Sequence, residues 1–359
     1  MSEEMGTLQE IFWDCFNGLA EKAASHYDVW EATILNLPYA PVAYTRGSLD
    51  YQYAYMSSFV DELIDLSVIL YQNNRAIGLW PVSLCKKNNV YEFVTNQGPV
   101  MPPVFVKNVS ERIIKKYDSL CLEAMHKFYK LVKNKHTIKS HWLTSVSFLS
   151  NEILSQNILW EEKCMLLGAV PHVVHDLYVD LSWPLEKIHA NMRKSYRSLI
   201  HEGERLWQVE VHDIADENIF EEFRKLHIDV AGRVTRPKKT WDLQLKAIKN
   251  GADFLVTLRD SEQRLCGGGL FEASSTEGCY AVGAYDRSLF DKPVSHVVQW
   301  TAIKHLKNLG KRWHYVGRRF YDSDIPKPTS KELQIAYFKE GFATNVALRL
   351  ALTLDLEKF

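Results

Sequence analysis

One order of predicted elements occurs twice along this chain of 359 residues, and this repeat limits the possible folds more than any other feature. Apolar alternation and turn residues predict strands, whereas apolar residues three or four apart predict helices. In the N-terminal half they predict three strands, a helix, a strand, a helix and a strand, at residues 66–71, 76–84, 90–95, 110–134, 142–148, 152–160 and 172–181.

The C-terminal half predicts the same order again. Its elements fall at residues 254–258, 268–273, 279–284, 295–309, 313–316, 331–339 and 345–354. Ser295 is the predicted N-cap of the first of these helices. Between the copies, helices are predicted at 185–206, 217–231 and 240–250. We therefore expect an α/β fold of two tandem domains, 1–181 and 182–359, with a helical insertion at the start of the second.

Charge and cysteine content exclude several classes of protein. Basic and acidic residues nearly balance, 43 against 44, so the chain is not basic in the way of a DNA-coating protein. The first four residues include two glutamates, unlike a secretory signal, and no stretch reaches the roughly 20 apolar residues that a bilayer requires. Six cysteines without a C-x-x-C pair are typical of reduced thiols. We expect a cytoplasmic protein with no membrane span and no DNA partner.

The loops that follow the third strand of each copy differ in their capacity to bind an anion. Such a loop presents free N–H groups and the positive end of a helix dipole. The first loop, 97–103, is interrupted by prolines, which have no N–H. The second loop, 285–296, keeps its donors and adds Arg287 and Lys292. We expect the second copy to be active and the first to be degenerate, structural or on the acceptor side. An ordinary solvated loop is the alternative.

Basic residues cluster locally in the C-terminal half. Six arginines carry the pattern: Arg193, Arg197, Arg233, Arg236, Arg318 and Arg319. A guanidinium at the end of an element can bind a carboxylate or phosphate through two parallel hydrogen bonds. These arginines are therefore the predicted binding residues for an anionic acceptor, and solvated helix surface is the alternative.

Familiar catalytic motifs for metals, nucleotides and acyl-serine chemistry are absent. His172 and His175 are three apart on a predicted strand and face opposite ways, so no metal site is expected there or elsewhere. The segment Asp322-Ser323-Asp324 matches the D-x-D pattern of many glycosyltransferases, which leaves a metal-dependent sugar transfer as a further alternative.

Three local strings resemble one family of transferases. They are the basic helix at 192–198, the segment 231–236 followed by Thr240 and Trp241, and the end of the last helix at 337–342. Together with the repeated order of elements, they resemble the FemAB/FemX-like double-GNAT N-acyltransferases. The resemblance covers residues 60–354 and implies transfer of an acyl group to an amine.

The resemblance also implies where the donor lies. It places the donor between the third and fourth strands of the second copy, near Ala284, Tyr285 and Trp313, with Arg287 and Lys292 beside them. Unpaired strand N–H groups at such a place can stabilise an oxyanion.

A neutral amine must attack, and a general base or a water relay must remove its proton. The polar candidates at the strand ends are Asp286, His296 and Tyr321. His296 is the first choice because the ordinary pKa of histidine lies near neutrality. A histidine that only caps its helix is the alternative.

Donor and acceptor stay open between alternatives. Acetyl-CoA-dependent GNAT enzymes usually have a Q/R-x-x-G-x-G/A loop, and residues 285–295 contain no glycine. FemX-like relatives lack that loop and take aminoacyl groups from tRNA, whereas other relatives are associated with amino sugars of surface polysaccharides. We expect acylation of an amino sugar or sugar nucleotide from acyl-CoA or a similar co-substrate, with no permanently bound cofactor. Aminoacyl transfer from tRNA and a non-catalytic binding module are the alternatives.

Overall fold

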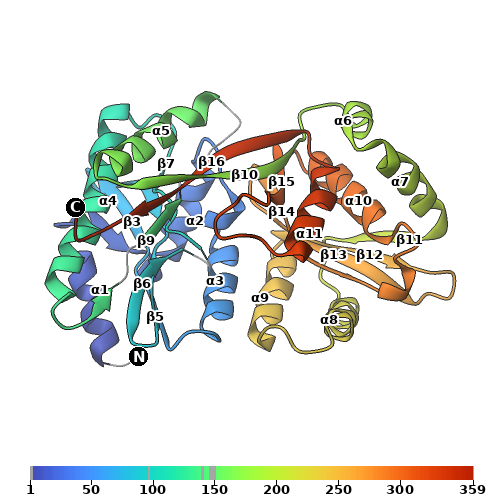
Figure 1. The fold of residues 1–359 in the computed structure, drawn as a ribbon, viewed down its shortest axis with the longest axis horizontal. Helices are drawn as coiled ribbons and strands as arrows, with labels where there is room; N and C mark the ends of the chain where they lie inside the picture. Colours follow the sequence, from blue (N-terminus) through green and yellow to red (C-terminus); the bar gives the residue numbers. More distant parts are fainter. Residues whose placement is uncertain (1–2, 96–97, 139–140, 145–150, 359) are drawn as a thin grey trace. The chain divides into compact units, whose positions relative to one another are not determined.

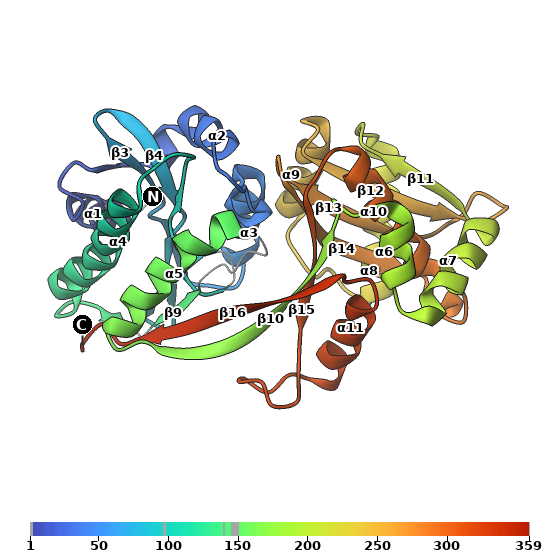
Figure 2. The same cartoon turned by 90° about the horizontal axis from the view of Figure 1, so that it is seen from above.

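The computed structural model describes residues 3–95, 98–138, 141–144 and 151–358. The chain forms two compact units, one of Met1–Val174 with Leu348–Phe359 and the other of His175–Ala347 (Figures 1 and 2). The division precedes the boundary expected at Ser182, and the C-terminal residues belong to the first unit. The chain therefore passes between the units twice, along β10 (Val170–Asp180) and β16 (Asn345–Leu354).

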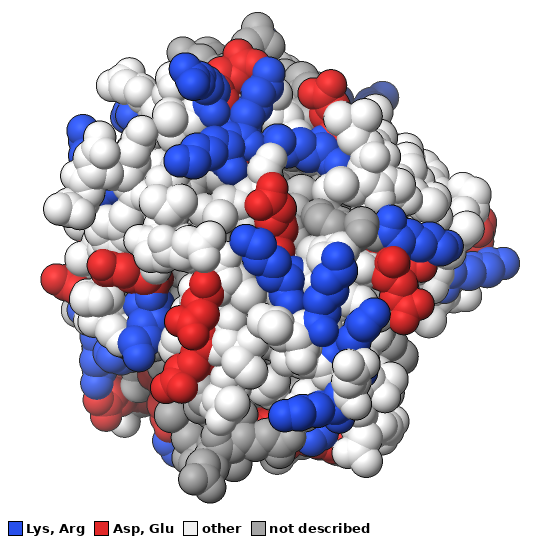
Figure 3. Space-filling view, turned by 90° about the vertical axis from the view of Figure 1, so that its left-hand side faces the viewer, with Lys and Arg blue, Asp and Glu red and all other residues white. Residues whose placement is uncertain are grey.

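On the face shown in Figure 3, Lys and Arg side chains lie in small groups with acidic and neutral atoms between them. A site for a nucleic-acid backbone needs many basic side chains side by side. Among the described residues, no helix is both long enough and apolar enough to cross a bilayer.

The first unit combines helices with two small sheets. Its strand orders are β1-β3-β4-β7 and β2-β5-β6-β8. The elements before β10 are α1 Glu3–Asp14, β1 Ala20–Lys22, α2 Tyr27–Leu35, α3 Arg46–Met56, β2 Glu62–Asp65, β3 Val68–Gln72, β4 Arg75–Trp80, β5 Ser83–Lys87, β6 Val90–Val94, β7 Val104–Phe105, α4 Glu111–Val132, β8 Thr137–Ile138, β9 His141–Thr144 and α5 Asn151–Leu166.

The predicted N-terminal meander is present with one difference. The strand predicted at 76–84 is two strands, β4 and β5, which belong to different sheets. Pro81 lies between them, and a proline has no N–H with which to continue a ladder. The three N-terminal helices and the short strands β1, β2, β7 and β8 were not predicted. The part of the predicted strand at 142–148 that follows Thr144 lies outside the described residues.

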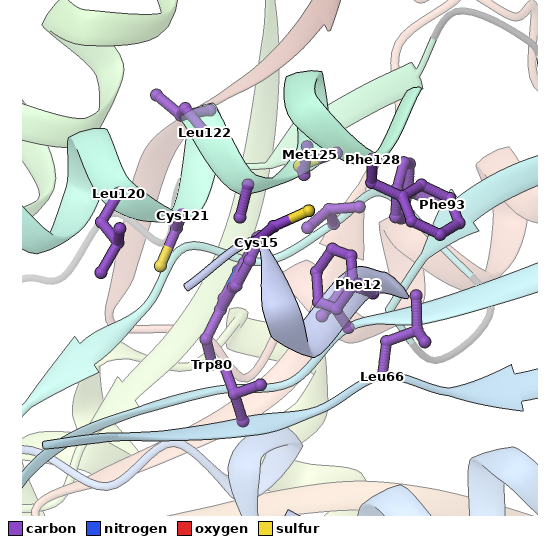
Figure 4. Close-up of a cluster of buried hydrophobic side chains, with 14 of the residues drawn as sticks. Phe12, Cys15, Leu66, Trp80, Phe93, Leu120, Cys121, Leu122, Met125 and Phe128 are labelled. Carbon is purple, nitrogen blue, oxygen red and sulfur yellow. The ribbon is translucent and has the colours of Figure 1, made fainter. Parts of the chain in front are cut away.

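Aromatic rings from helices and strands form the core of the first unit (Figure 4). The ring centroid of Phe12 in α1 lies 5.6 Å from that of Phe128 in α4 and 5.9 Å from that of Phe93 in β6. Trp80 of β4 lies 6.2 Å from Phe12. The C-terminal segment adds three buried side chains to this core: Leu352, Leu354 and Leu356. Their burial explains why the end of the chain returns to the first unit.

The second unit is built on one sheet with the strand order β11-β12-β13-β14-β15-β10. Neighbouring strands are antiparallel except β14 and β15, which are parallel. The elements are α6 Leu185–Asn191, α7 Lys194–Leu206, β11 Gln208–His212, α8 Glu217–Ala231, α9 Lys238–Lys249, β12 Asp253–Arg259, β13 Leu265–Ala273, β14 Glu277–Tyr285, α10 Val294–Asn308, β15 Trp313–Arg319, α11 Ser330–Glu340 and β16. The predicted elements of the second copy are confirmed.

Helices cover both faces of this sheet. Ile188 of α6, Tyr196 of α7 and Val298 of α10 are buried in one cluster with strand residues. Phe223 of α8 and Trp241 of α9 are buried in a second cluster. Because each face has its own core, the strands between them read as nearly continuous apolar runs in the sequence.

Local signals begin and end two of these helices. Asp216 caps α8 by accepting hydrogen bonds from two backbone N–H groups, and Gly232 ends it in the left-handed conformation. Thr329 and Glu332 form a capping box at the start of α11.

Two predicted helix boundaries were wrong. α10 begins at Val294 with Pro293 at the N-cap position, so Ser295 lies inside the helix. The helix predicted over 185–206 is two helices, because Met192 and Arg193 have extended ψ angles of 155° and 133°. β11, which follows them, was not predicted.

Candidate functional site

The sheet of the second unit opens between β14 and β15. The strands pair only at their N-terminal ends: Glu277↔Trp313, Gly278↔His314 and Cys279↔Tyr315. Beyond these pairs β14 stays bonded to β13 as far as Tyr285, and β15 stays bonded to β10 as far as Arg319. No further pair joins β14 to β15 among the described residues, so backbone groups of both strands face the opening.

A bulge in β14 lies beside the opening. Tyr280 pairs with Phe271 and the next paired residue is Val282, so Ala281 is the extra residue and is exposed. A bulge bends its strand and redirects the side chains that follow. The hydroxyl oxygens of Tyr280 and Tyr285 lie 3.4 Å apart, and burial raises the pKa of both phenols. Both are therefore neutral at pH 7.

A lysine of α11 reaches the same place. The Nζ atom of Lys339 lies 5.4 Å from the ring centroid of Tyr280, and its side chain crosses β15 at Gly317. A Cβ at Gly317 would lie 2.5 Å from that Nζ and would displace it, and the φ of +141° at Gly317 favours glycine. Burial lowers the pKa of Lys339, and Cys279 partly opposes this. The amino group is thus poorly solvated and close to both strands of the opening.

Lys339 was missed as a site residue. It belongs to the string 337–342 that carries the family resemblance, but a lysine in the last turn of a helix is ordinarily explained by the helix dipole. Nothing in local sequence distinguishes a solvated lysine there from one turned toward a sheet.

Several solved structures superpose on this chain over most of their length. FemX matches it with a TM-score of 0.63 over 92% of this chain and 96% of FemX, at 10% sequence identity. This chain has the FemX-like double-GNAT fold. L-PGS from Bacillus licheniformis matches with a TM-score of 0.52 over 80% of this chain and 83% of its own, at 11% identity. The C-terminal domain (DUF2156) of a protein described as a lysylphosphatidylglycerol synthetase from Agrobacterium fabrum matches with 0.55 over 92% of each chain, at 11% identity.

The similarity is one of structure. No protein-family model matches the chain, and no curated protein matches it by sequence. The predicted fold, two tandem GNAT-like domains, is confirmed by the FemX-like architecture.

Two of the predicted acceptor arginines, Arg193 and Arg319, interact with groups of α11. Nη2 of Arg193 donates to the carbonyl of Tyr337, 2.9 Å away. Nε of Arg319 lies 3.1 Å from a carboxylate oxygen of Glu340. Both partners belong to α11, so these guanidinium groups hold the helix that carries Lys339.

The other four predicted acceptor arginines are distributed differently. Arg236 is buried with its guanidinium 3.4 Å from the ring centroid of Trp241, and Arg318 lies 4.7 Å from that of Phe320. Arg197 is half-buried and Arg233 is exposed. Arg236 is therefore the worst placed of these four to meet an anion from solvent, and the exposed Arg233 is the best placed.

The first-choice general base, His296, lies among aromatic rings. Its ring centroid is 4.5 Å from that of Tyr196 and 5.2 Å from that of Phe338. Burial, together with Arg193, lowers its pKa to about 4. A group with so low a pKa holds an abstracted proton weakly at neutral pH, so the surroundings favour a packing role.

The other two base candidates are also engaged. Asp286 accepts hydrogen bonds from the N–H and the hydroxyl of Ser288, and these bonds lower the pKa of Asp286. Arg264 lies 3.3 Å from the same carboxylate. The ring of Tyr321 is partly exposed and lies 4.8 Å from that of His175. The base therefore stays a prediction.

The predicted donor residues on β14 and β15 differ in their position relative to the opening. Trp313 pairs with Glu277 at the closed end, so it does not border the open part, whereas Tyr285 lies at the open end. Ala284 is buried in the cluster under α8 and α9.

Arg287 and Lys292 belong to the loop that follows β14, and both are exposed. Arg287 lines a cavity of about 570 Å³ with Arg264 and Asp286. The Nζ of Lys292 lies 5.9 Å from the ring centroid of Trp207. Both cations are accessible to solvent.

The first unit contains a separate cavity of about 290 Å³. The buried guanidinium of Arg46 lies 2.5 Å from Asp50 and 3.9 Å from Asp65 at this cavity, and 4.2 Å from the ring centroid of Tyr27. Glu31 accepts a hydrogen bond from the backbone of Arg46. Asp50 and Asp65 line the cavity beside one guanidinium, so the cavity suits ammonium and hydroxyl donors better than phosphate.

The D-x-D segment forms a loop. Asp324 accepts a hydrogen bond from the backbone N–H of Tyr321, 3.1 Å away. No group of three or more His, Cys, Asp or Glu side chains could hold a metal ion in the part of the chain that the structure describes.

Proposed function

We propose that this protein transfers an acyl group from an activated donor to an amine, and that transfer takes place in the opening between β14 and β15. The observation that carries the proposal is the position of the Lys339 amino group beside these separated strands. Attack of a neutral amine on the donor carbonyl forms a C–N bond and a negatively charged oxygen. Loss of the leaving alcohol or thiol and of the amine proton completes the transfer.

The opening supplies two kinds of stabilisation for that oxygen. Backbone N–H groups of separated strands can donate to it without reorganisation. An ammonium group in a poorly solvated place interacts with a developing negative charge more strongly than it would in water. Lys339 is accordingly the residue whose removal should slow the chemical step.

An amino sugar or sugar nucleotide is our proposed acceptor. Exposed Arg233 and half-buried Arg197 can bind its phosphate groups. The acidic cavity of the first unit is compatible with the hydroxyl and ammonium groups of the same class of ligand.

Aminoacyl transfer is the second candidate, and two observations favour it. The loop from Asp286 to Pro293 contains no glycine with which to surround a pyrophosphate closely. The fold is similar to FemX and to a protein described as a lysylphosphatidylglycerol synthetase. An aminoacyl ester would then be the donor in place of acyl-CoA.

Mass spectrometry of the products tests these proposals together. The protein is incubated with acetyl-CoA and glucosamine or UDP-glucosamine, and separately with aminoacyl-tRNA and the same amines. We expect a product with one added acyl group, lost in Lys339→Met and kept in Lys331→Met, because Lys331 is exposed on the same helix. Tight ligand binding without any product would identify a non-catalytic binding module instead.

A gel-shift measurement separates the two donors. Binding to tRNA through phosphates weakens steeply as salt rises. A shift with aminoacyl-tRNA at low salt would favour aminoacyl transfer, and the lack of one would leave the CoA thioester as the donor.

A further inference from the structure

The start of α7 donates hydrogen bonds to the end of α11. The backbone N–H of Arg193 donates to the carbonyl of Gly341, and its Nη2 to the carbonyl of Tyr337, both over 2.9 Å. Its Nη1 donates to the hydroxyl of Tyr196 over 2.9 Å, and that hydroxyl donates to the carbonyl of Phe338 over 3.2 Å. The last carbonyls of a helix lack the full set of partners that interior carbonyls have, so α7 supplies additional donors to this end of α11.

Charge and shape strengthen this contact. The guanidinium of Arg193 lies 3.8 Å from the ring centroid of Tyr337, and a positive charge near a helix C-terminus is favoured by the dipole. The ring of Tyr196 occupies the space that a Cβ on Gly341 would need, so the glycine permits this close approach. Arg319 of β15 binds Glu340 of the same turn.

Lys339 lies inside the turn that is held in this way. The carbonyls bound by Arg193 and Tyr196 belong to residues on both sides of it in the sequence. Ordering a lysine side chain costs conformational entropy, so its backbone must be firmly placed for the amino group to stay in one position.

We infer that Arg193 is a positioning residue, which binds the last turn of α11 and thereby holds the Lys339 amino group in the opening between β14 and β15. Its side chain is only 25% exposed, and both of its Nη atoms donate to protein groups. Arg193 therefore acts through Lys339. The sequence had predicted instead that Arg193 binds the acceptor. The inference rests on the proposed function for its kinetic consequence, but not for its structural one.

Trace acetylation of the folded protein with acetic anhydride tests the structural consequence without any substrate. The relative labelling of each lysine at one neutral pH is measured by peptide mass spectrometry. In Arg193→Ala we expect Lys339 to be labelled about tenfold faster than in wild type, because local opening exposes its amino group. Lys331, which is exposed at the start of the same helix, should be labelled at an unchanged rate. Arg193→Lys keeps the charge and one donor and should give an intermediate rate.

Kinetics with whichever donor and acceptor give product test the role in transfer. In Arg193→Ala we expect kcat to fall about 10- to 100-fold with little change in the acceptor KM, because misplacement of a reacting group affects the transition state. A raised KM with unchanged kcat and unchanged Lys339 labelling would overturn the inference in favour of acceptor binding.

The outcomes separate this inference from the proposed function. Faster labelling of Lys339 with no transferase activity in any variant or in wild type would support positioning and refute the function. If Arg193→Ala does not fold, Tyr196→Phe removes the hydroxyl, its bond to the carbonyl of Phe338 and the bond that it accepts from Arg193, and we expect about threefold faster labelling of Lys339. An unchanged rate in a folded Tyr196→Phe, with an unchanged rate in Arg193→Lys, would also overturn the inference.

Discussion

At the scale of single residues, burial decides the protonation of three histidines in the second unit more than neighbouring charge does. His314 is fully buried on β15, and burial lowers its pKa to about 4 although its ring contacts the carbonyl of Gly278. His227 and His296 have pKa values lowered to about 4 for the same reason. All three rings are neutral in the folded protein at pH 7.

The lowered pKa of His314 predicts a loss of stability in acid. The unfolded ring binds a proton below about pH 6.5, whereas the folded ring does so only near pH 4, so the unfolded state gains protons as the pH falls between these values. We expect His314→Asn to remove on the order of 2 to 3 kcal/mol of this acid-induced loss. Urea unfolding of wild type and variant across this window measures it.

His201 is the matched control, because it is exposed on α7. His201→Asn should leave the pH dependence of the free energy of unfolding unchanged. Equal slopes for wild type and His314→Asn would show that the ring is solvated in solution.

At the scale of elements, two neighbouring strands bury a pair of carboxyl groups. Asp253 of β12 and Glu272 of β13 are register partners and both are buried. Burial, and secondly the charge of Glu272, raise the pKa of Asp253 well above its ordinary value. The folded state therefore binds a proton that the unfolded state releases, and stability falls as the pH rises above about 4.

Asp253→Asn is expected to stabilise the protein at pH 7 by about 1 to 2 kcal/mol. The carboxyl group ionises readily in the unfolded chain but not when buried, whereas the amide is neutral in both states. Thermal unfolding at pH 7 and pH 4 measures the effect, which should shrink at the lower pH. Asp322→Asn, at an exposed carboxylate, is the control and should change the melting temperature little. A lower melting temperature for Asp253→Asn at pH 7 would contradict the assignment.

The contact between β15 and α11 gives a second prediction at this scale. In Gly317→Ala the new Cβ meets the Lys339 side chain at a backbone φ of +141°, so we expect a loss of about 1 to 3 kcal/mol and displacement of the lysine. Unfolding by urea gives the first, and acetylation of Lys339 gives the second. Gly310→Ala also has a positive φ but nothing within 4 Å, so it separates backbone strain from the clash. Equal labelling of Lys339 in both variants would refute the close packing at Gly317.

At the scale of the whole chain, the C-terminal strand belongs to two units in turn. Asn345 to Ala347 lie in the second unit, whereas the residues from Leu348 onward belong to the first. Ala351 to Leu354 pair with β9, and Leu352 is fully buried in the core of the first unit.

Leu352→Ala should therefore destabilise the first unit by about 2 to 4 kcal/mol, through lost burial and the cavity left behind. Hydrogen exchange should show the greatest loss of protection in α1, α4 and β6, and less in α8 and α9. Leu348→Ala, at a position 61% exposed on the same strand, is the control and should change little. Loss of protection confined to α8 and α9 would contradict the placement of the end of β16 in the first unit.

The sequence by itself determined the order of the elements, above all in the second unit. Helix α8 lies at the predicted residues and β16 at the predicted 345–354, because capping residues and apolar periodicity act within a few residues along the chain. The repeated order of elements and the resemblance carried by the three local strings together predicted the FemX-like double-GNAT fold.

Only the tertiary structure decided which polar groups remain available for chemistry. Arg193 and Arg319 read as exposed cations in the sequence, yet their partners lie on α11, far away along the chain. The position of Lys339 depends on Gly317 of β15. The opening beside this lysine depends on where the pairing of β14 with β15 stops. Hydrogen bonds and burial between distant segments set these features, and local sequence patterns carry no record of such partners.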